Sequence, residues 1–133
     1  MLAALKAGLS YFAIIFAAGF IFGTIRIIAV APLVGGTLAV AIELPVILAL
    51  SWFVCRWIAD RLSVHQRYGP RLTMGGIAFA LLIAAEMILG IFGFGQTVSQ
   101  FLGVYGTAEG ALGLLGQFAF GLFPLVQLWR GAR

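Results

Sequence analysis

The sequence predicts an all-α integral membrane protein, an up-down bundle of four transmembrane helices with both termini in the cytoplasm. Three observations favour this fold class. The 133 residues are 63% hydrophobic and only 9% charged, whereas a soluble domain carries about 25% charged residues. The apolar residues form four runs of about twenty residues, long enough to cross a hydrocarbon core of about 30 Å. Lysine and arginine flank these runs mainly on one side.

The first two spans are predicted from their apolar runs and from the turn between them. The first span covers about residues 8–31, because Pro32 and the glycines behind it favour a tight turn. This run is about twice as long as the hydrophobic region of a secretory signal and contains Arg26, so we expect an uncleaved helix. The second span covers about residues 37–58 and ends beside Trp57, a typical interfacial anchor. The short turn makes the two spans antiparallel neighbours.

The first span also contains a GxxxG pattern, Gly19-Phe20-Ile21-Phe22-Gly23, which permits close helix crossing. Packing against another helix of the chain is favoured here over self-association of two copies.

The third and fourth spans follow the most polar stretch of the chain. They are predicted at about residues 73–94 and 110–129, joined by a polar connection. Glycines line one face of each span, and small faces favour close helix packing. None of the four runs shows the alternation of a lipid-facing β-strand, so helices are expected instead of a barrel. Residues 1–133 are predicted to form a single membrane domain, since no remaining segment is long enough for another.

The basic residues predict the orientation of the bundle. Lys6, four arginines around the loop between the second and third spans, Arg130 and Arg133 all belong to one side. Neither loop on the other side contains lysine or arginine, so the positive-inside rule places the basic side in the cytoplasm. The predicted location is a bacterial inner membrane. These residues lie at span ends and form no surface for reading nucleic acid, so no nucleic-acid partner is expected.

Little in the composition points to catalysis or to a cofactor. Cys55 is the only cysteine and His65 the only histidine, so we expect no disulfide, metal site or cofactor. Ser51 has no histidine or aspartate at its depth, and nucleophilic catalysis has no support. The sequence therefore favours a protein that is not an enzyme, with no catalytic residue. A membrane enzyme acting on a lipid or a quinone is the weakest of the alternatives.

Three ionisable residues inside the predicted spans are the informative ones. Arg26, Glu43 and Glu86 fall in the outer half of the membrane, within about 5 Å of a common level at 1.5 Å per residue. Charges at this depth are costly and usually face the bundle with a partner. Arg26 and Glu43 are expected to form an ion pair across the short turn. One arginine cannot neutralise two carboxylates, so one carboxylate should hold a proton, a cation or a polar ligand.

The functional hypotheses follow from these residues together with Gln117, the polar group on the smooth face of the fourth span. If the charges only join helices, the protein is an accessory, assembly or structural subunit of a larger membrane complex, which the composition slightly favours. Alternatively, Arg26, Glu43, Glu86 and Gln117 form a binding site in a small homo-oligomeric transporter or channel for a proton, cation or small solute. The expected partners are the lipid bilayer and either another membrane protein or further copies of the chain.

Overall fold

The computed structural model describes residues 2–64, 67–93 and 95–131, without the side chains of residues 109 and 129–131. Within these ranges the chain folds into helices and turns and contains no strand. Four helices are long and apolar enough to span a membrane, at Leu2–Val34, Gly36–Arg61, Tyr68–Gly93 and Gly110–Leu128. This result confirms the predicted all-helical fold with four long apolar helices, and it is consistent with a multi-pass membrane protein. Arg130, Arg133 and His65, which the sequence analysis considers, lie outside the described residues or side chains.

The helices follow the predicted spans but extend beyond them. Helix α1 covers Leu2–Ile25 and continues through η1 (Arg26–Val30) and α2 (Ala31–Val34). The other elements are, in order, α3 (Gly36–Arg61), α4 (Tyr68–Ile88), η2 (Leu89–Gly93), α5 (Val98–Gly103), η3 (Val104–Gly106) and α6 (Ala108–Gly131). The first helix begins about six residues before the predicted span, because nothing between residues 2 and 8 interrupts the helical pattern.

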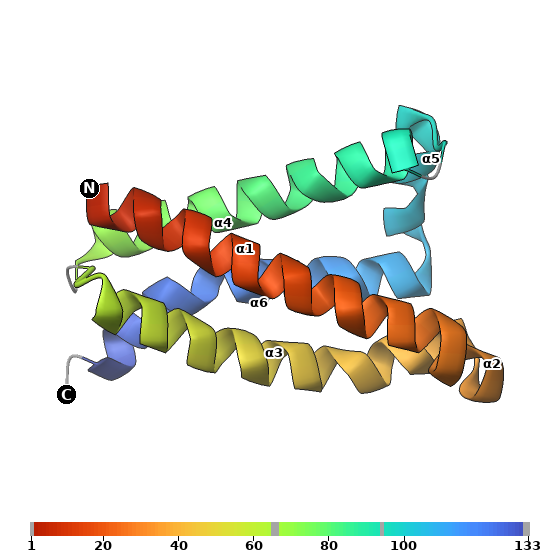
Figure 1. The fold of residues 1–133 in the computed structure, drawn as a ribbon, viewed down its shortest axis with the longest axis horizontal. Coiled ribbons are helices and arrows are strands. Elements are labelled where there is room, and N and C mark those ends of the chain that lie inside the picture. Colours follow the sequence, from red (N-terminus) through yellow and green to blue (C-terminus); the bar gives the residue numbers. More distant parts are fainter. Residues whose placement is uncertain (1, 65–66, 94, 132–133) are drawn as a thin grey trace.

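The four long helices run side by side along the bundle (Figure 1). α1 contacts α3 and α4, and α6 contacts the same two helices from the other side. The two chain ends lie at one end of the bundle, and α2 and α5 lie at the opposite end (Figure 1). The turn between α2 and α3 is made by Gly35, whose φ of +89° suits a residue without a Cβ. α1 and α3 are therefore neighbours in space as well as in sequence.

The best-packed core lies toward the end of the bundle that holds the chain ends. Its members share nearly complete burial and include Ala7, Tyr11, Cys55, Met74 and Ala78. The Tyr11 hydroxyl donates a 2.8 Å hydrogen bond to the carbonyl oxygen of Phe120, and the two rings stack with centroids 4.2 Å apart. These contacts link α1 to α6 across the bundle. The ionisable residues of the spans lie beyond this core, toward α2 and α5.

The smooth faces of the third and fourth spans pack against each other. A Cβ added at Gly75 would lie 2.0 Å from the carbonyl oxygen of Gly121, so the α4 and α6 backbones touch there. This contact is the close packing that small residues permit between membrane helices. Pro45 and Pro124 lie inside α3 and α6, which continue through them as helices.

Two local structures were not predicted from the sequence. Five-residue π-helical segments, η1 and η2, occur near the α2 and α5 end of the bundle. The polar connection between the third and fourth spans also folds into α5, whose first turn is held by a capping box. In that box Thr97 accepts from the Gln100 backbone, and the Gln100 side chain accepts from the Thr97 backbone.

Candidate functional site

The ion pair expected across the first turn is present in the structure. Arg26 begins η1 and Glu43 lies two turns into α3, so the turn at Gly35 brings the two side chains together. Arg26 Nη1 donates to Glu43 Oε2. The two side chains are only partly covered, with 30% of Arg26 and 15% of Glu43 exposed. The pair therefore joins α1 and α3 and still presents charge to the space beside it.

A second polar contact joins the other two helices. Gln117 of α6 donates from Nε2 to the Oε2 atom of Glu86 on α4. The other end of this amide, the Oε1 atom of Gln117, is buried without a hydrogen-bond partner among the described residues. A buried amide oxygen without a partner is uncommon and usually marks a place for water or a polar ligand. Gln117 thus has capacity for one more polar contact.

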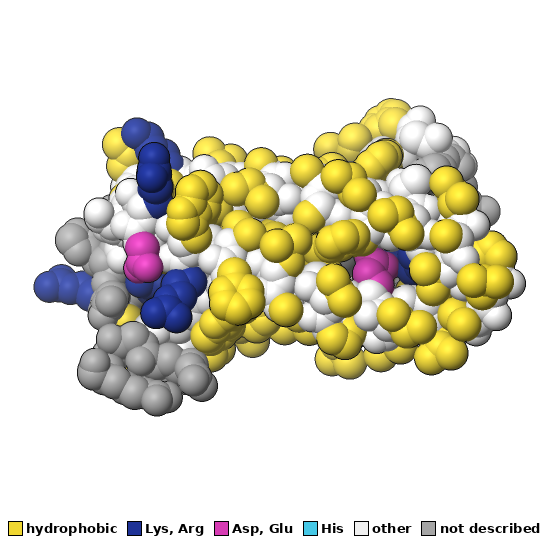
Figure 2. Space-filling model, turned by 60° about the horizontal axis from the view of Figure 1, so that its bottom comes forward, with side chains coloured by type: hydrophobic (Ala, Val, Ile, Leu, Met, Phe, Trp, Pro, Cys, Tyr) yellow, Lys and Arg dark blue, Asp and Glu magenta, His cyan; other side chains and the backbone are white. Residues whose placement is uncertain are grey.

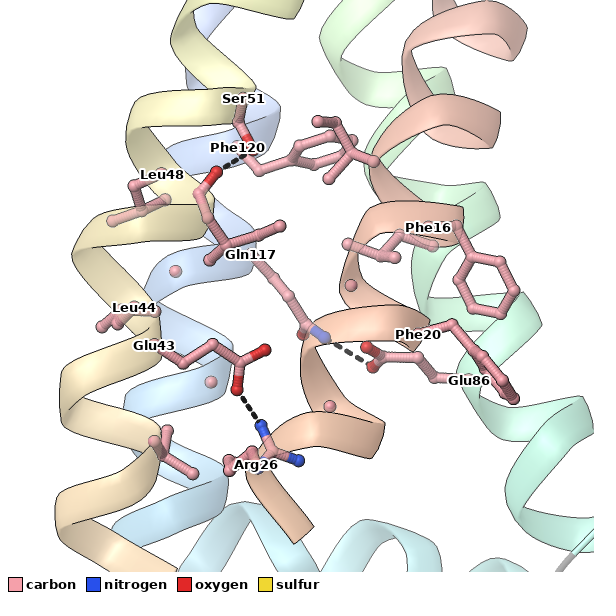
Figure 3. A pocket seen from close by; sticks show the side chains of 18 of the residues that line it. Phe16, Phe20, Arg26, Glu43, Leu44, Leu48, Ser51, Glu86, Gln117 and Phe120 are labelled. Carbon is pink, nitrogen blue, oxygen red and sulfur yellow. Dashed lines mark hydrogen bonds and ion pairs between the residues drawn. The ribbon is translucent and has the colours of Figure 1, made fainter. Parts of the chain in front are cut away.

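These four side chains line one cavity, here called the polar pocket. Its volume is about 370 Å³, which falls within the range of ligand pockets, roughly 300–1,000 Å³. Figure 3 shows Gln117 reaching from α6 into the space between α1 and α3, with Glu86 on one side and the Arg26–Glu43 pair on the other. The sequence analysis singled out Arg26, Glu43, Glu86 and Gln117, and the structure brings all four to this pocket. Whether they bind a ligand stays a prediction.

Most of the remaining pocket lining is apolar or small. Phe16, Phe20 and Phe120 contribute aromatic rings, and leucine and isoleucine side chains fill the space between them. Ser51 also lines the pocket, but its hydroxyl donates to the Ile47 carbonyl oxygen at 2.7 Å. A few polar groups in an apolar wall are typical of a site that orients a small ligand.

Glycines in α1 create part of this space. Gly19 and Gly23 form a GxxxG pattern, for which the sequence favours packing against another helix of the chain. Instead, both glycines line the polar pocket. A Cβ at Gly19 would meet no atom within 4 Å, and one at Gly23 would meet only the Arg26 side chain, at 3.8 Å. That packing interpretation is wrong for this structure, because the missing side chains leave open volume and not a helix crossing.

Tyr105 is a neighbour of the site that the sequence analysis did not identify. Its hydroxyl is buried without a hydrogen-bond partner among the described residues. Burial raises the pKa of Tyr105, and the nearby Glu86 carboxyl raises it further. The phenol therefore stays neutral at physiological pH. No sequence signal marks this residue, because its proximity to Glu86 depends on how η3 folds over the end of the bundle.

The polar groups that line the pocket are better suited to binding a ligand than to catalysing a covalent reaction. The pocket lining holds two carboxylates, one guanidinium and one carboxamide, but no cysteine, histidine or lysine. Among the described residues, no group of three or more His, Cys, Asp or Glu side chains could hold a metal ion. The single free thiol, Cys55, is buried in the core and does not line the pocket.

Similarity to known proteins does not help to assign a function to this pocket. Comparison with protein-family models, with curated proteins and with solved structures finds no match.

Proposed function

We propose that this chain is a small transporter or channel-like membrane protein whose polar pocket binds a proton or a monovalent cation. The observation that carries this proposal is the gathering of Arg26, Glu43, Glu86 and Gln117 around one cavity of about 370 Å³. Ionisable side chains inside membrane spans usually mark a pathway or a binding site. A cavity beside them adds the space that a purely structural ion pair does not need.

The charge balance of the pocket determines the kind of ligand. Arg26 pairs with Glu43, and among the described residues Glu86 has a hydrogen bond only with the neutral Gln117. A carboxylate in an apolar surrounding is stabilised by taking up a proton or by an adjacent cation. Glu86 is therefore the residue that exchanges a proton for a cation. The charges of Arg26 and Glu43 balance each other in their ion pair.

The proposal also includes the membrane topology. We place the chain in a bacterial inner membrane as an up-down bundle with both termini in the cytoplasm, supported by the basic residues near the end where the termini lie (Figures 1 and 2). The pocket then lies in the outer half of the membrane. A membrane-impermeant maleimide applied to intact cells should label a Thr107→Cys variant and spare Ser63→Cys. Labelling of Ser63→Cys alone would reverse the orientation.

Proton release on cation binding tests the proposed function directly. Tetramethylammonium chloride is added to the purified protein in weakly buffered detergent solution, with benzyltrimethylammonium chloride as a second probe. Binding of either cation should release protons from the wild type. Glu86→Gln should release none, and it should keep the wild-type elution volume on size exclusion. Asp60→Asn is the matched control, because Asp60 is an exposed carboxylate outside the pocket.

The outcomes of this titration are distinct. Proton release by the wild type and by Asp60→Asn, but not by Glu86→Gln, supports exchange at Glu86. If neither cation releases protons from the wild type, the chain has no such cation site and the proposal fails. Equal release from the wild type and Glu86→Gln moves the exchange to another group and also contradicts it.

An accessory or structural subunit of a membrane complex is the second candidate. The Arg26–Glu43 pair favours it, because an ion pair between two neighbouring helices stabilises a bundle without any ligand. This candidate predicts that reversing both charges restores the expression lost on reversing either one. It also predicts that the protein is recovered from its membranes in a fixed ratio with other subunits.

A further inference from the structure

The polar pocket opens through the side of the bundle, and this fact narrows the ligand class. Phe20 and Ile27 line the pocket, and 55% and 64% of these residues are exposed. They lie on α1 and η1, and Glu43 reaches from α3 toward Arg26 of η1 (Figure 3). The partly exposed Arg26–Glu43 pair, which joins η1 to α3, marks the mouth of the pocket on the side of α1 and α3.

The surface of the molecule is consistent with a pocket mouth on the side of the bundle. Figure 2 shows an acidic and a basic side chain exposed on the flank of the molecule, ringed by hydrophobic side chains. The partial exposure of Glu43 and Arg26 matches this view. In a bundle that spans a membrane, such a flank faces lipid. A ligand passing the mouth therefore comes from the bilayer and leaves any long apolar part there.

The lining of the pocket determines the rest of the ligand. The rings of Phe16 and Phe20 line the pocket and are available to an aromatic group or to an organic cation, which aromatic rings attract within about 6 Å. Two carboxylates against one guanidinium favour a single positive charge on the ligand. The unpartnered Oε1 of Gln117 accepts a hydrogen bond and so also suits a positively charged or donor group.

We propose that the polar pocket takes amphipathic organic monocations directly from the bilayer, through the mouth between α1 and α3. The cationic head lies between Glu86, Gln117 and the phenylalanine rings, and an alkyl tail extends through the mouth into lipid. This inference rests on the proposed function, because it names the class of cation that displaces the proton from Glu86.

The chain offers a matched pair of variants for the test. Gly19 lines the pocket, and a Cβ there meets no atom within 4 Å, so Gly19→Leu places its side chain in the pocket without a backbone clash at the Cβ. Gly76 on α4 is exposed, lies outside the pocket lining, and also has open space around an added Cβ. Gly76→Leu therefore repeats the substitution in a helix where it should not affect the ligand.

Retention of tritiated benzyldimethyldodecylammonium by lipid nanodiscs gives the measurement. Nanodiscs that hold the wild type, Gly19→Leu or Gly76→Leu have the same lipid background, so differences report the protein site. The wild type and Gly76→Leu should retain the probe above empty nanodiscs. Gly19→Leu should weaken retention at least about tenfold, the change that about 1.4 kcal/mol produces. Excess neutral dodecylbenzene should not displace the probe, whereas excess unlabelled benzyldimethyldodecylammonium should.

The outcomes separate this inference from the proposed function. If tetramethylammonium and benzyltrimethylammonium release protons but the dodecyl compound is not retained, cation exchange stands and access from the bilayer is wrong. If Gly19→Leu retains the probe as the wild type does, the ligand lies outside the polar pocket and the inference fails. If dodecylbenzene displaces the probe, the site recognises apolar chains without charge, which also overturns it. If no cation releases protons, the proposed function fails first.

Discussion

At the scale of single residues, two tyrosine hydroxyls have opposite surroundings in the same bundle. Tyr11 is fully buried and donates a 2.8 Å hydrogen bond to Phe120 across the core. Tyr105 places its hydroxyl in a buried position without a described partner. A buried hydrogen bond contributes about 1 kcal/mol to stability, whereas a buried polar group without a partner lowers it by about 1–3 kcal/mol. The same chemical group should therefore have opposite effects at the two positions.

Replacing each tyrosine by phenylalanine tests this difference. Tyr11→Phe should lower the free energy of unfolding by about 1 kcal/mol, because it removes the bond to the Phe120 carbonyl. Tyr105→Phe should leave it unchanged or raise it by up to about 1 kcal/mol, because it removes a hydroxyl without a partner. Denaturant titration in a mild detergent, followed by tryptophan fluorescence, measures both. Equal destabilisation by the two variants would mean that the Tyr105 hydroxyl has a partner, such as water.

Most polar residues of the candidate site could be identified from residue type and position in the sequence. Arg26, Glu43 and Glu86 were identifiable because charged side chains are costly inside an apolar span, so their presence alone predicts partners. Gln117 was identifiable because it is the polar residue on a smooth helix face. Tyr105 could not be found this way, because a tyrosine near a span end is common as an interfacial anchor. Its burial depends on tertiary contacts that the sequence pattern does not contain.

At the scale of helices, glycine has two different roles in this bundle. At Gly75 the absent side chain lets α4 touch α6, since an added Cβ would lie 2.0 Å from the Gly121 carbonyl oxygen. At Gly19 the absent side chain leaves part of the pocket open. Spacing along the sequence cannot separate these roles, because the two roles differ only in whether another backbone lies opposite. This ambiguity explains why the GxxxG pattern in the first span was misinterpreted.

Adjacent glycines on α4 test the packing role. Gly75→Ala should force α4 and α6 apart and destabilise the protein by about 1–3 kcal/mol, the usual effect of overpacking. Gly76→Ala should have no destabilising effect, because its added Cβ meets no atom within 4 Å. The melting temperature in detergent, measured for both variants under the same conditions, gives the comparison. Similar melting temperatures for the two variants would contradict the close contact between the helices.

The helical elements differ in how far local sequence determines them. Span positions follow from apolar length, so each predicted span falls on one of the four long helices. The π-helical segments η1 and η2 were not predicted, because their composition does not differ from that of the α-helices they extend. The capping box of α5 has a recognisable spacing, Thr97 followed by Gln100. That signal was present in the sequence, within a stretch that was treated only as a polar connection.

At the scale of the whole molecule, packing is divided along the length of the bundle. The core around Tyr11, Met74 and Ala78 fills the half near the chain ends. The polar pocket occupies space in the other half, lined mainly by α1, α3 and α6. A ligand in the polar pocket can therefore be accommodated without opening the packed core. Four helices are few for a complete transport path, which is why the proposed transporter is a homo-oligomer.

The native mass of the protein therefore decides between the two functional candidates. The chain is extracted from its own membranes in a mild detergent and analysed by native mass spectrometry, without overexpression. A transporter of this size should appear as a homo-oligomer, at a small integer multiple of the 14.1 kDa chain. Recovery in fixed ratio with other subunits would instead support the accessory role, and the Arg26–Glu43 pair would then serve mainly to join α1 and α3. A monomer with a functional pocket would contradict the requirement for several copies, while cation exchange at Glu86 would be tested independently.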